Sequence, residues 1–300
     1  MEKGKVISFI NMKGGVAKTT LTINIGNELA KQGNKVLIVD MDPQFNATQS
    51  LLLHRVRNLQ EDSSENNENE AEAETIDQEI KSSQEYEKLS NEKQTVLQFF
   101  EPSNVSQPID NPSLVQEIVQ NLYLIPGDLT MAKQISGDTA NKVGAVIEHF
   151  NKHNITYDYD FVLIDCPPTW SILTHSSLFA SDYYIIPSKV DLYSSIGIEL
   201  LEEQISEKIL NDAVFNLTER DLKSLGIIFT LVHRSVKSEE DRMDLLKRNF
   251  PDKNFFNSNL PHMPSIPTKF VMFEEGRRNS VYNHLINAIE KITSELLGKL

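Results

Sequence analysis

Apolar residues along this chain come mostly in short continuous blocks, which is typical of strands that are buried on both faces of a sheet. Such blocks, rich in β-branched and aromatic residues, occupy residues 5–11, 35–40, 122–126, 160–165, 182–187 and 226–232. A shorter strand is predicted near Phe255. Polar or turn-forming residues follow most of these blocks, so we expect several strands to end in loops at the same edge of one sheet.

Helices are predicted between these strands, where apolar residues recur every three or four positions. In residues 19–32, Leu21, Ile25 and Leu29 form one apolar stripe, and Gly33 is placed to end the helix. The other predicted helices cover residues 47–53, 128–135, 139–153, 194–210, 238–249 and 279–297. This alternation predicts one α/β domain over residues 1–300, with a mostly parallel twisted sheet and helices on both faces.

An acidic segment, residues 58–94, interrupts the alternation. Residues 60–95 contain 12 acidic and 3 basic residues, so they carry −9 of the formal charge of −14. Few aromatic or β-branched side chains are present to offset the entropy of ordering. We therefore expect a surface insertion that is disordered or helical. The functional alternative is an acidic segment that docks a basic partner or shields the protein from DNA.

Composition favours a cytoplasmic protein. The single cysteine, Cys166, excludes an internal disulfide and a four-cysteine metal site within one chain, and we expect a small buried thiol there. No signal-peptide pattern is present, and no apolar run reaches the roughly 18 residues that span a bilayer. Residues 233–278 carry 9 basic and 7 acidic residues, so the acidity of the whole chain does not extend to this region.

A glycine-rich loop joins the first predicted strand to the first predicted helix. Small residues such as Gly14 and Gly15 let backbone N–H groups surround phosphates, and the helix N-terminus adds partial positive charge. Lys18 is placed to reach the β- and γ-phosphates, Thr19 to bind Mg²⁺, and Thr20 to contact the α-phosphate. The loop predicts a P-loop NTPase that binds ATP and Mg²⁺.

The loop departs from the ordinary pattern, because Lys13 lies five residues before Lys18 and Ala17 replaces the last glycine. K-G-G-V-A-K-T-T resembles the deviant Walker A motif of the ParA/MinD family, and the stretch after it resembles ParA-type partition ATPases. The resemblance implies that the nucleotide is bound by Lys13, Gly14, Gly15, Val16, Ala17, Lys18, Thr19 and Thr20. It also implies that Lys13 contacts phosphates held by the partner subunit of an ATP-dependent homodimer.

Residues 39–48, V-D-M-D-P-Q-F-N-A-T, resemble the D-x-D-P-Q-x-N-x-T switch segment of this family. The resemblance implies that Asp42 orients the attacking water, and that Asp42, Lys13 and Lys18 serve hydrolysis. Phe45 replaces a frequent glycine, and we expect it to slow movement of the loop.

Residues 162–168, V-L-I-D-C-P-P, resemble a Walker B strand. The implied Mg²⁺ site consists of Thr19, Asp40 and Asp165, with Asp40 supporting the coordination shell of the Mg²⁺ ion. By the same resemblance, residues 187–191 lie near the dimer face, and residues 232–235 and 261–267 border the adenine.

The resemblance further implies DNA binding without sequence preference in the ATP state, and hydrolysis that is slow until a ParB-type centromere-binding protein stimulates it. Phosphate contacts of this kind come from basic side chains. The candidates are Arg234, Lys237, Arg242, Lys247, Arg248, Lys269, Arg277 and Arg278. A solvated face with balanced charges is the alternative. We expect a cytoplasmic, nucleoid-associated ATPase that acts in plasmid or chromosome partition.

Three other classes of protein fit the sequence less well. A MinD-like membrane switch would use the apolar stripe of Ile286, Ile289, Ile292 and Leu296 as an anchor. The tail has no net positive charge, so packing on the sheet is favoured and no membrane binding is expected. A relative of the nitrogenase iron protein needs two cysteines per chain, and a metabolic kinase has no use for Lys13.

Overall fold

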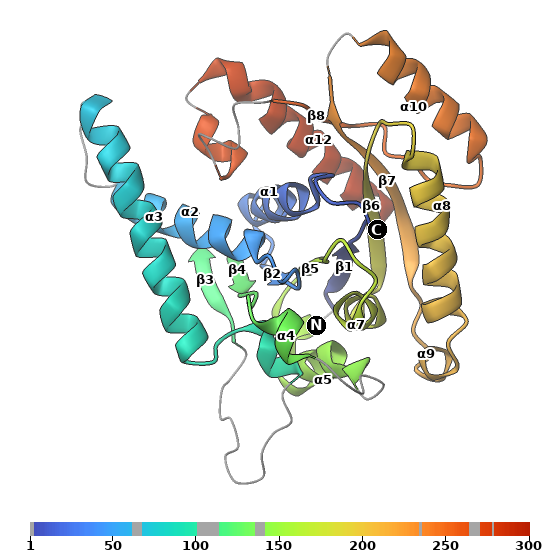
Figure 1. Cartoon of the computed structure of the whole chain (residues 1–300), viewed down its shortest axis with the longest axis horizontal. Helices are drawn as coiled ribbons and strands as arrows, with labels where there is room; N and C mark the ends of the chain where they lie inside the picture. Colours follow the sequence, from blue (N-terminus) through green and yellow to red (C-terminus); the bar gives the residue numbers. More distant parts are fainter. Residues whose placement is uncertain are drawn as a thin grey trace.

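The structure is a computed structural model that describes residues 3–61, 68–100, 114–135, 142–233, 236–263, 271–277 and 279–300. Within these residues, eight strands form one sheet in the order β3-β4-β2-β5-β1-β6-β7-β8 (Figure 1). The strands are β1 (Lys5–Phe9), β2 (Val36–Asp40), β3 (Gln116–Val119), β4 (Leu122–Ile125), β5 (Phe161–Asp165), β6 (Tyr183–Lys189), β7 (Lys223–Val232) and β8 (Leu260–Pro261). Every neighbouring pair is parallel except β3 with β4. The predicted P-loop NTPase fold, with a mostly parallel sheet, is confirmed.

The strands next to the glycine-rich loop are apolar because both faces of the sheet are covered. Consecutive residues of β2 point to opposite sides, so that Val36 and Ile38 belong to one hydrophobic cluster and Leu37 and Val39 to another. On one face pack α1 (Lys18–Lys31), α2 (Asn46–Glu61) and α12 (Asn283–Lys299). On the other pack α5 (Ala145–Lys152), α7 (Ile172–Ala180) and α8 (Ser194–Ile205).

Strand register brings the candidate chemistry together at one edge of the sheet. In the parallel register, Asp165 at the end of β5 lies opposite Asp40 on β2 and opposite Phe9 on β1. The glycine-rich loop begins directly after β1. Carboxyl ends of neighbouring parallel strands meet at the same edge, which is where open α/β sheets bind ligands.

Several predicted boundaries were wrong. Of the helix predicted over residues 139–153, residues 139–141 lie outside the described residues, and the described part becomes α-helical only at Ala145, directly after Gly144, a residue that weakens helices. Phe255 makes one isolated bridge, with Ile227, instead of a strand. The C-terminal helix begins at Asn283 and not at residue 279.

The remaining described elements are short or lie at the periphery. They are α3 (Glu68–Asn91), η1 (Val96–Phe99), α4 (Met131–Gln134), α6 (Ile155–Asp158), η3 (Ser206–Leu210), α9 (Ala213–Leu217), α10 (Lys237–Asn249), η4 (Phe273–Gly276) and η5 (Ser280–Tyr282). The strand β3 and the helix α7 were not predicted from the sequence.

Of the acidic segment, the structure describes residues 58–61 and 68–94, and all of these are helical except residues 92–94. Helix α2 continues to Glu61, well past the predicted end at residue 53, and α3 runs beside it at the outer edge of the sheet (Figure 1). Gln78, Ser82 and Leu89 of α3 are buried, while most of the charged side chains that the structure describes in residues 75–91 face solvent. One face of α3 therefore packs on the protein.

Helix α12 packs with its apolar stripe against α1. Ile286, Ile289, Ile292 and Leu296 are all buried. Among the described residues, no helix combines the length and the apolar character needed to cross a bilayer.

Candidate functional site

The loop between β1 and α1 has the backbone shape that a phosphate cradle needs. Gly15 and Ala17 have positive φ angles of 66° and 61°, a conformation that glycine adopts readily and alanine seldom does. Thr230 donates a hydrogen bond to the Val16 carbonyl at 3.0 Å. The Asn11 side chain donates to the Pro187 carbonyl at 2.7 Å. These bonds fasten the loop to β7 and β6, and the N-terminus of α1 begins directly at Lys18.

Lys18 and Thr19 lie where the loop meets the first turn of α1. The Lys18 ammonium donates to the Asn11 carbonyl at 3.1 Å, and only 6% of this residue is exposed. Burial lowers the pKa of Lys18, against the opposing effect of Asp165 and Asp42. The Thr19 hydroxyl donates to Asp165 Oδ2 at 2.6 Å. Both predicted phosphate-loop side chains thus lie beside the predicted Walker B carboxylate.

Asp165 has the unmet bonding that a cation would satisfy. It is fully buried, and among the described residues its Oδ1 has no hydrogen-bond partner. Burial raises its pKa well above the ordinary value, and the nearby Asp40 raises it further. A Mg²⁺ ion or its water would supply the missing charge and contact, so Thr19 and Asp165 fit the predicted metal site.

Asp40 is placed to support that site rather than to bind a metal directly. Its Oδ2 accepts hydrogen bonds from the Thr48 backbone at 2.8 Å and the Thr48 hydroxyl at 2.7 Å, and its Oδ1 accepts from the Asp42 backbone at 3.2 Å. Burial raises the pKa of Asp40 to about 7. In the described part of the chain, no three His, Cys, Asp or Glu side chains form a ready metal cage. This fits Mg²⁺, which proteins hold through one or two carboxylates together with phosphates and water.

Asp42 lies on the loop after β2, close to Lys18. Its Oδ1 accepts a hydrogen bond from the Gln44 backbone at 3.0 Å, and the side chain is mostly buried. Burial raises its pKa, while the Gln44 bond and Lys18 act in the opposite direction. A carboxylate beside the phosphate-binding lysine has the position needed to orient an attacking water.

Lys13 occupies a different environment from Lys18. Its side chain is half exposed and forms an ion pair with Asp191. Asp191 also accepts hydrogen bonds from the Ser194 hydroxyl at 3.0 Å and the Tyr193 backbone at 3.1 Å. Burial acts to raise the pKa of Asp191, but the hydrogen bonds from Lys13 and Ser194 prevail and lower it. Lys13 is therefore directed along the surface of its own subunit.

The sequence did not identify Lys189 as a neighbour of the phosphate loop. Its ammonium lies 3.8 Å from the place where a Cβ on Gly15 would be. Lys189 ends β6, which pairs with β1, so a correct strand order would have placed it beside the loop. An exposed apolar surface next to Asp191 was also missed. It consists of Leu192, Tyr193, Ile196 and Leu200, with exposed fractions of 73%, 72%, 55% and 55%.

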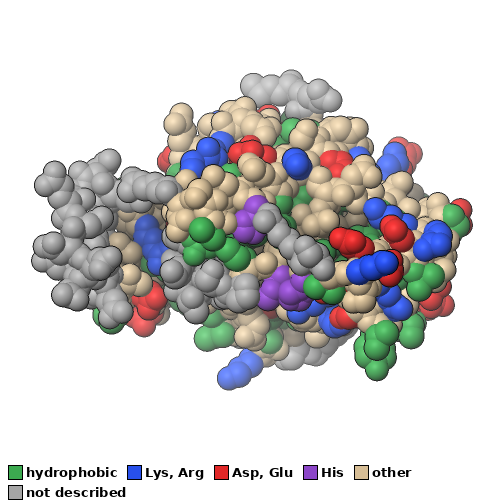
Figure 2. Space-filling view, turned by 90° about the horizontal axis from the view of Figure 1, so that it is seen from above, with side chains coloured by type: hydrophobic (Ala, Val, Ile, Leu, Met, Phe, Trp, Pro, Cys, Tyr) green, Lys and Arg blue, Asp and Glu red, His purple; other side chains and the backbone are tan. Residues whose placement is uncertain are grey.

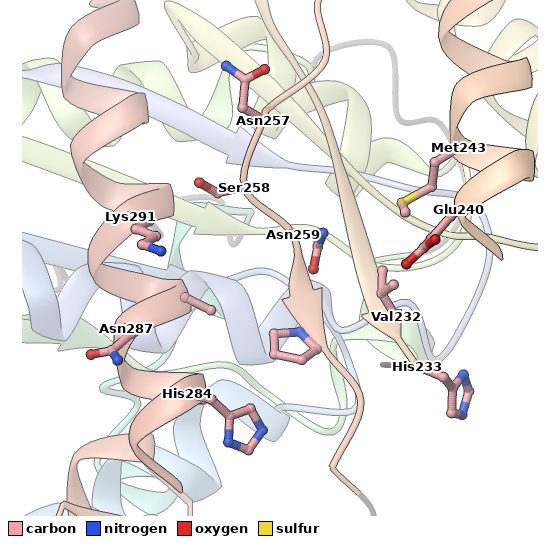
Figure 3. A pocket seen from close by; sticks show the side chains of 12 residues that line it. Val232, His233, Glu240, Met243, Asn257, Ser258, Asn259, His284, Asn287 and Lys291 are labelled. Atoms are coloured by element: carbon pink, nitrogen blue, oxygen red, sulfur yellow. The ribbon is translucent and has the colours of Figure 1, made fainter. Parts of the chain in front are cut away.

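A cavity of about 670 Å³ lies between α12, the β8 segment, β7 and α10 (Figure 3). Its lining includes Val232, His233 and Pro261, which belong to the two segments predicted to border the adenine. Residues 234–235 and 264–267 of these segments lie outside the described residues. The cavity has the size of a small-molecule site, and adenine binding there stays a prediction.

The candidate DNA-binding residues fall into separate places. Lys237, Arg242, Lys247 and Arg248 lie on α10, whereas Arg277 directly follows η4 and pairs with Glu274 at 3.0 Å and Glu290 at 3.5 Å. The Arg242 side chain donates to the Leu192 carbonyl at 2.8 Å. Figure 2 shows basic and acidic side chains interspersed on the face seen from above. Arg234, Lys269 and Arg278 lie outside the described residues.

Cys166 is a buried thiol, as predicted. It follows Asp165 and is fully enclosed. Burial raises its pKa to about 12, so it is a small core side chain and not a reactive thiolate.

The chain is similar to several known proteins. A protein-family model described as AAA domain matches residues 4–217. The chain is 29% identical to the chromosome-partitioning ATPase Soj of Treponema pallidum, over 86% of this chain and 83% of the relative. It resembles a plasmid partition protein of Borrelia burgdorferi bound to AMPPNP, with a TM-score of 0.69, 20% identity and 100% of both chains covered. It also resembles cobyrinic acid a,c-diamide synthase of Mycobacterium smegmatis with bound ATP analogue and magnesium, with a TM-score of 0.65 and 23% identity over 98% and 94% of the two chains.

Proposed function

The chain belongs to the ParA/MinD family of P-loop ATPases, and we propose that it is a partition ATPase that uses MgATP to assemble as a dimer on DNA. One observation carries this proposal. Lys18 and Asp165 are both buried and Thr19 donates a hydrogen bond to Asp165, as a phosphate and metal site would require, while Lys13 of the same loop stays on the surface. The related partition proteins named above support the biological assignment.

Hydrolysis uses the buried part of the site. Lys18 binds the β- and γ-phosphates, Thr19 and Asp165 hold Mg²⁺, and Asp42 orients the attacking water. When bound, Mg²⁺ would neutralise part of the negative charge on the phosphate oxygens. Lys13 is paired with Asp191 in the isolated chain, so its charge is engaged by a carboxylate of its own subunit. We expect slow hydrolysis until a ParB-type centromere-binding partner stimulates it.

Dimerisation uses the exposed part of the site. Lys13 lies beside the apolar surface of Leu192, Tyr193, Ile196 and Leu200. Exposed apolar surface next to a functional loop is typical of an interface. A second subunit that covers this surface would bring its own phosphates within reach of Lys13, which is the contact that the family resemblance implies.

DNA binding is proposed for the exposed cations of α10, chiefly Lys237, Lys247 and Arg248. Contacts of basic side chains to DNA phosphates need no base recognition and weaken as salt rises. A dimer doubles the number of such contacts, which links DNA binding to the ATP state. The protein would then act in the cytoplasm, associated with the nucleoid.

The decisive experiment compares DNA with membranes. The full chain is incubated with ATP, ADP or no nucleotide, and its retention on DNA of random sequence and on vesicles of anionic phospholipid is measured over a range of salt concentrations. We expect retention on DNA, only with ATP, and loss of retention at high salt. Retention on the vesicles but not on DNA would overturn the proposal in favour of a MinD-like switch, although the stripe of α12 is buried.

A matched pair of variants tests the surface itself. Lys247→Ala combined with Arg248→Ala removes two cations from α10, and Lys208→Ala combined with Lys223→Ala removes two exposed lysines elsewhere. The first pair should weaken DNA binding about tenfold or more, since each phosphate contact contributes to the salt-dependent affinity. Equal effects of the two pairs would show that α10 is not the DNA-binding surface.

A further inference from the structure

Two aromatic rings from distant parts of the sequence stack beside the candidate catalytic loop. Phe45 belongs to the loop that carries Asp42, and Tyr86 belongs to α3 of the acidic segment. Their ring centroids are 4.5 Å apart and the ring planes differ by 17°. An offset stack of this kind is a directional contact that orients one ring on the other.

Phe45 and Asp42 form one rigid turn. The Phe45 backbone donates to the Asp42 carbonyl at 2.8 Å, and the Gln44 backbone donates to the Asp42 side chain at 3.0 Å. Phe45 itself has a φ angle of 42°, in the left-handed region where a bulky residue is strained. A residue in such a conformation needs contacts from its surroundings to stay there, and the stacked ring of Tyr86 is one of them.

Helix α3 gives Tyr86 a fixed position. Glu85 forms an ion pair with Arg55 of α2, and Leu89 is buried in the hydrophobic cluster under α1 and α2. The Tyr86 hydroxyl accepts a hydrogen bond from the Leu129 backbone at 3.1 Å. Tyr86 is therefore held mainly by the packing of α3, to which its hydroxyl adds one hydrogen bond, and its ring supports Phe45.

We propose that α3 positions the catalytic loop, with Tyr86 as a positioning residue that acts on Asp42 through Phe45. This assigns a role in ATP hydrolysis to the acidic segment. The inference rests on the proposed function for the role of Asp42, but the contact between α3 and the loop is testable without any nucleotide.

The first test measures hydrogen exchange of the loop in the nucleotide-free full chain. In Tyr86→Ala, the Gln44 and Phe45 amides should exchange about fivefold faster than in the wild type, because their bonds to Asp42 open more often. Tyr86→Phe keeps the ring and should exchange at the wild-type rate. Tyr157→Ala, which removes an exposed tyrosine from α6, is the matched control. Unchanged exchange in Tyr86→Ala would overturn the inference.

The second test measures single-turnover hydrolysis of MgATP and the affinity for MgATP in the same variants. Tyr86→Ala should hydrolyse ATP about fivefold more slowly, with its affinity for MgATP within about twofold of wild type, because small misplacement of a catalytic group slows the chemical step. Tyr86→Phe should restore the rate. A faster rate, a loss of affinity that matches the loss of rate, or failure of Tyr86→Phe to restore the rate would each contradict a positioning role.

A double-mutant cycle separates the stack from a general loss of stability. Phe45→Gly suits the left-handed backbone and removes the other ring. If the two rings act together, adding Tyr86→Ala to Phe45→Gly should not lower the rate of ATP hydrolysis any further. Additive losses of rate in the double variant would overturn the inference.

Asp42→Ala separates the proposed catalytic role of Asp42 from the inference about α3. If Asp42→Ala hydrolyses ATP normally, the proposed role of Asp42 fails, whatever Tyr86 does. If Asp42→Ala is inactive while Tyr86→Ala hydrolyses ATP normally, only the inference about α3 fails.

Discussion

Lys13 and Lys18 belong to the same loop but occupy opposite environments. Lys18 is almost fully buried, touches the loop backbone and lies beside Asp42 and Asp165. Lys13 is half exposed, and the surface next to it is apolar. The inner region, with Lys18, Thr19, Asp40 and Asp165, is built entirely by one chain. The outer region, with Lys13, Asp191 and the apolar residues of α8, is exposed and is the part proposed to contact a second subunit. Nucleotide binding and assembly should therefore respond to different substitutions.

Lys18→Ala should have the largest effect. It removes the buried cation that faces the phosphates, and we expect the affinity for MgATP to fall about 100-fold or more, which corresponds to about 2.7 kcal/mol. Isothermal titration with MgATP measures this, and Lys31→Ala at the other end of α1 is the control. Retained tight binding would refute the assignment of the inner region, provided that circular dichroism shows a folded protein.

Asp40→Asn should change how stability depends on pH in the metal-free protein. The pKa of Asp40 is about 7 in the folded protein, against an ordinary value of 3.8 for the unfolded chain. At a pH between these two values, Asp40 is protonated in the folded state but ionised in the unfolded chain. The free energy of unfolding should fall as pH rises from about 4 to 7, by about 2 kcal/mol or more. Asp40→Asn should flatten this slope in urea titrations without Mg²⁺, while Asp252→Asn on the surface should not. An unchanged slope would mean that Asp40 titrates at its ordinary pKa.

Lys13→Ala tests the outer region. Nucleotide affinity of the monomer should stay within about twofold, while the ATP-dependent dimer should weaken about tenfold, a loss of about 1.4 kcal/mol. Analytical ultracentrifugation with a non-hydrolysable ATP analogue measures the dimer, and Lys208→Ala controls for the loss of one exposed charge. A normal dimer would rule out the contact of Lys13 with the partner subunit.

These two regions were not equally predictable. The inner region follows from local sequence, because β2 and β5 are continuous apolar runs, and each delivers an aspartate at the same edge of the sheet. The loop and the first turn of α1 then follow directly after β1. Strand, loop and helix are adjacent along the chain, so residue order alone places most of these groups.

The outer region depends on contacts between residues that are far apart. Lys13 and Asp191 are separated by 178 positions, and the position of Lys189 depends on β6 pairing with β1. The strand β3 is short, partly polar and antiparallel, so its sequence lacks the continuous apolar pattern of the central strands. The narrow buried face of α3 could not be recognised from the acidic composition of the whole helix. The composition of a helix averages over both of its faces, whereas its packing depends only on the face that is buried.

Asp191→Asn should have the smallest effect and sharpens the comparison further. In the isolated chain, Asp191 forms an ion pair with Lys13, and this pairing would compete with the proposed contact of Lys13 across the dimer. The pair is partly exposed and screened by solvent, so breaking it should tighten the ATP-dependent dimer by only about two- to threefold. Asp221→Asn breaks another exposed pair, with Lys223, and should leave the dimer unchanged. The same ultracentrifugation assay measures both variants. If Asp191→Asn weakens the dimer instead, Asp191 itself contributes to the interface, and Lys13 reaches the partner while still paired.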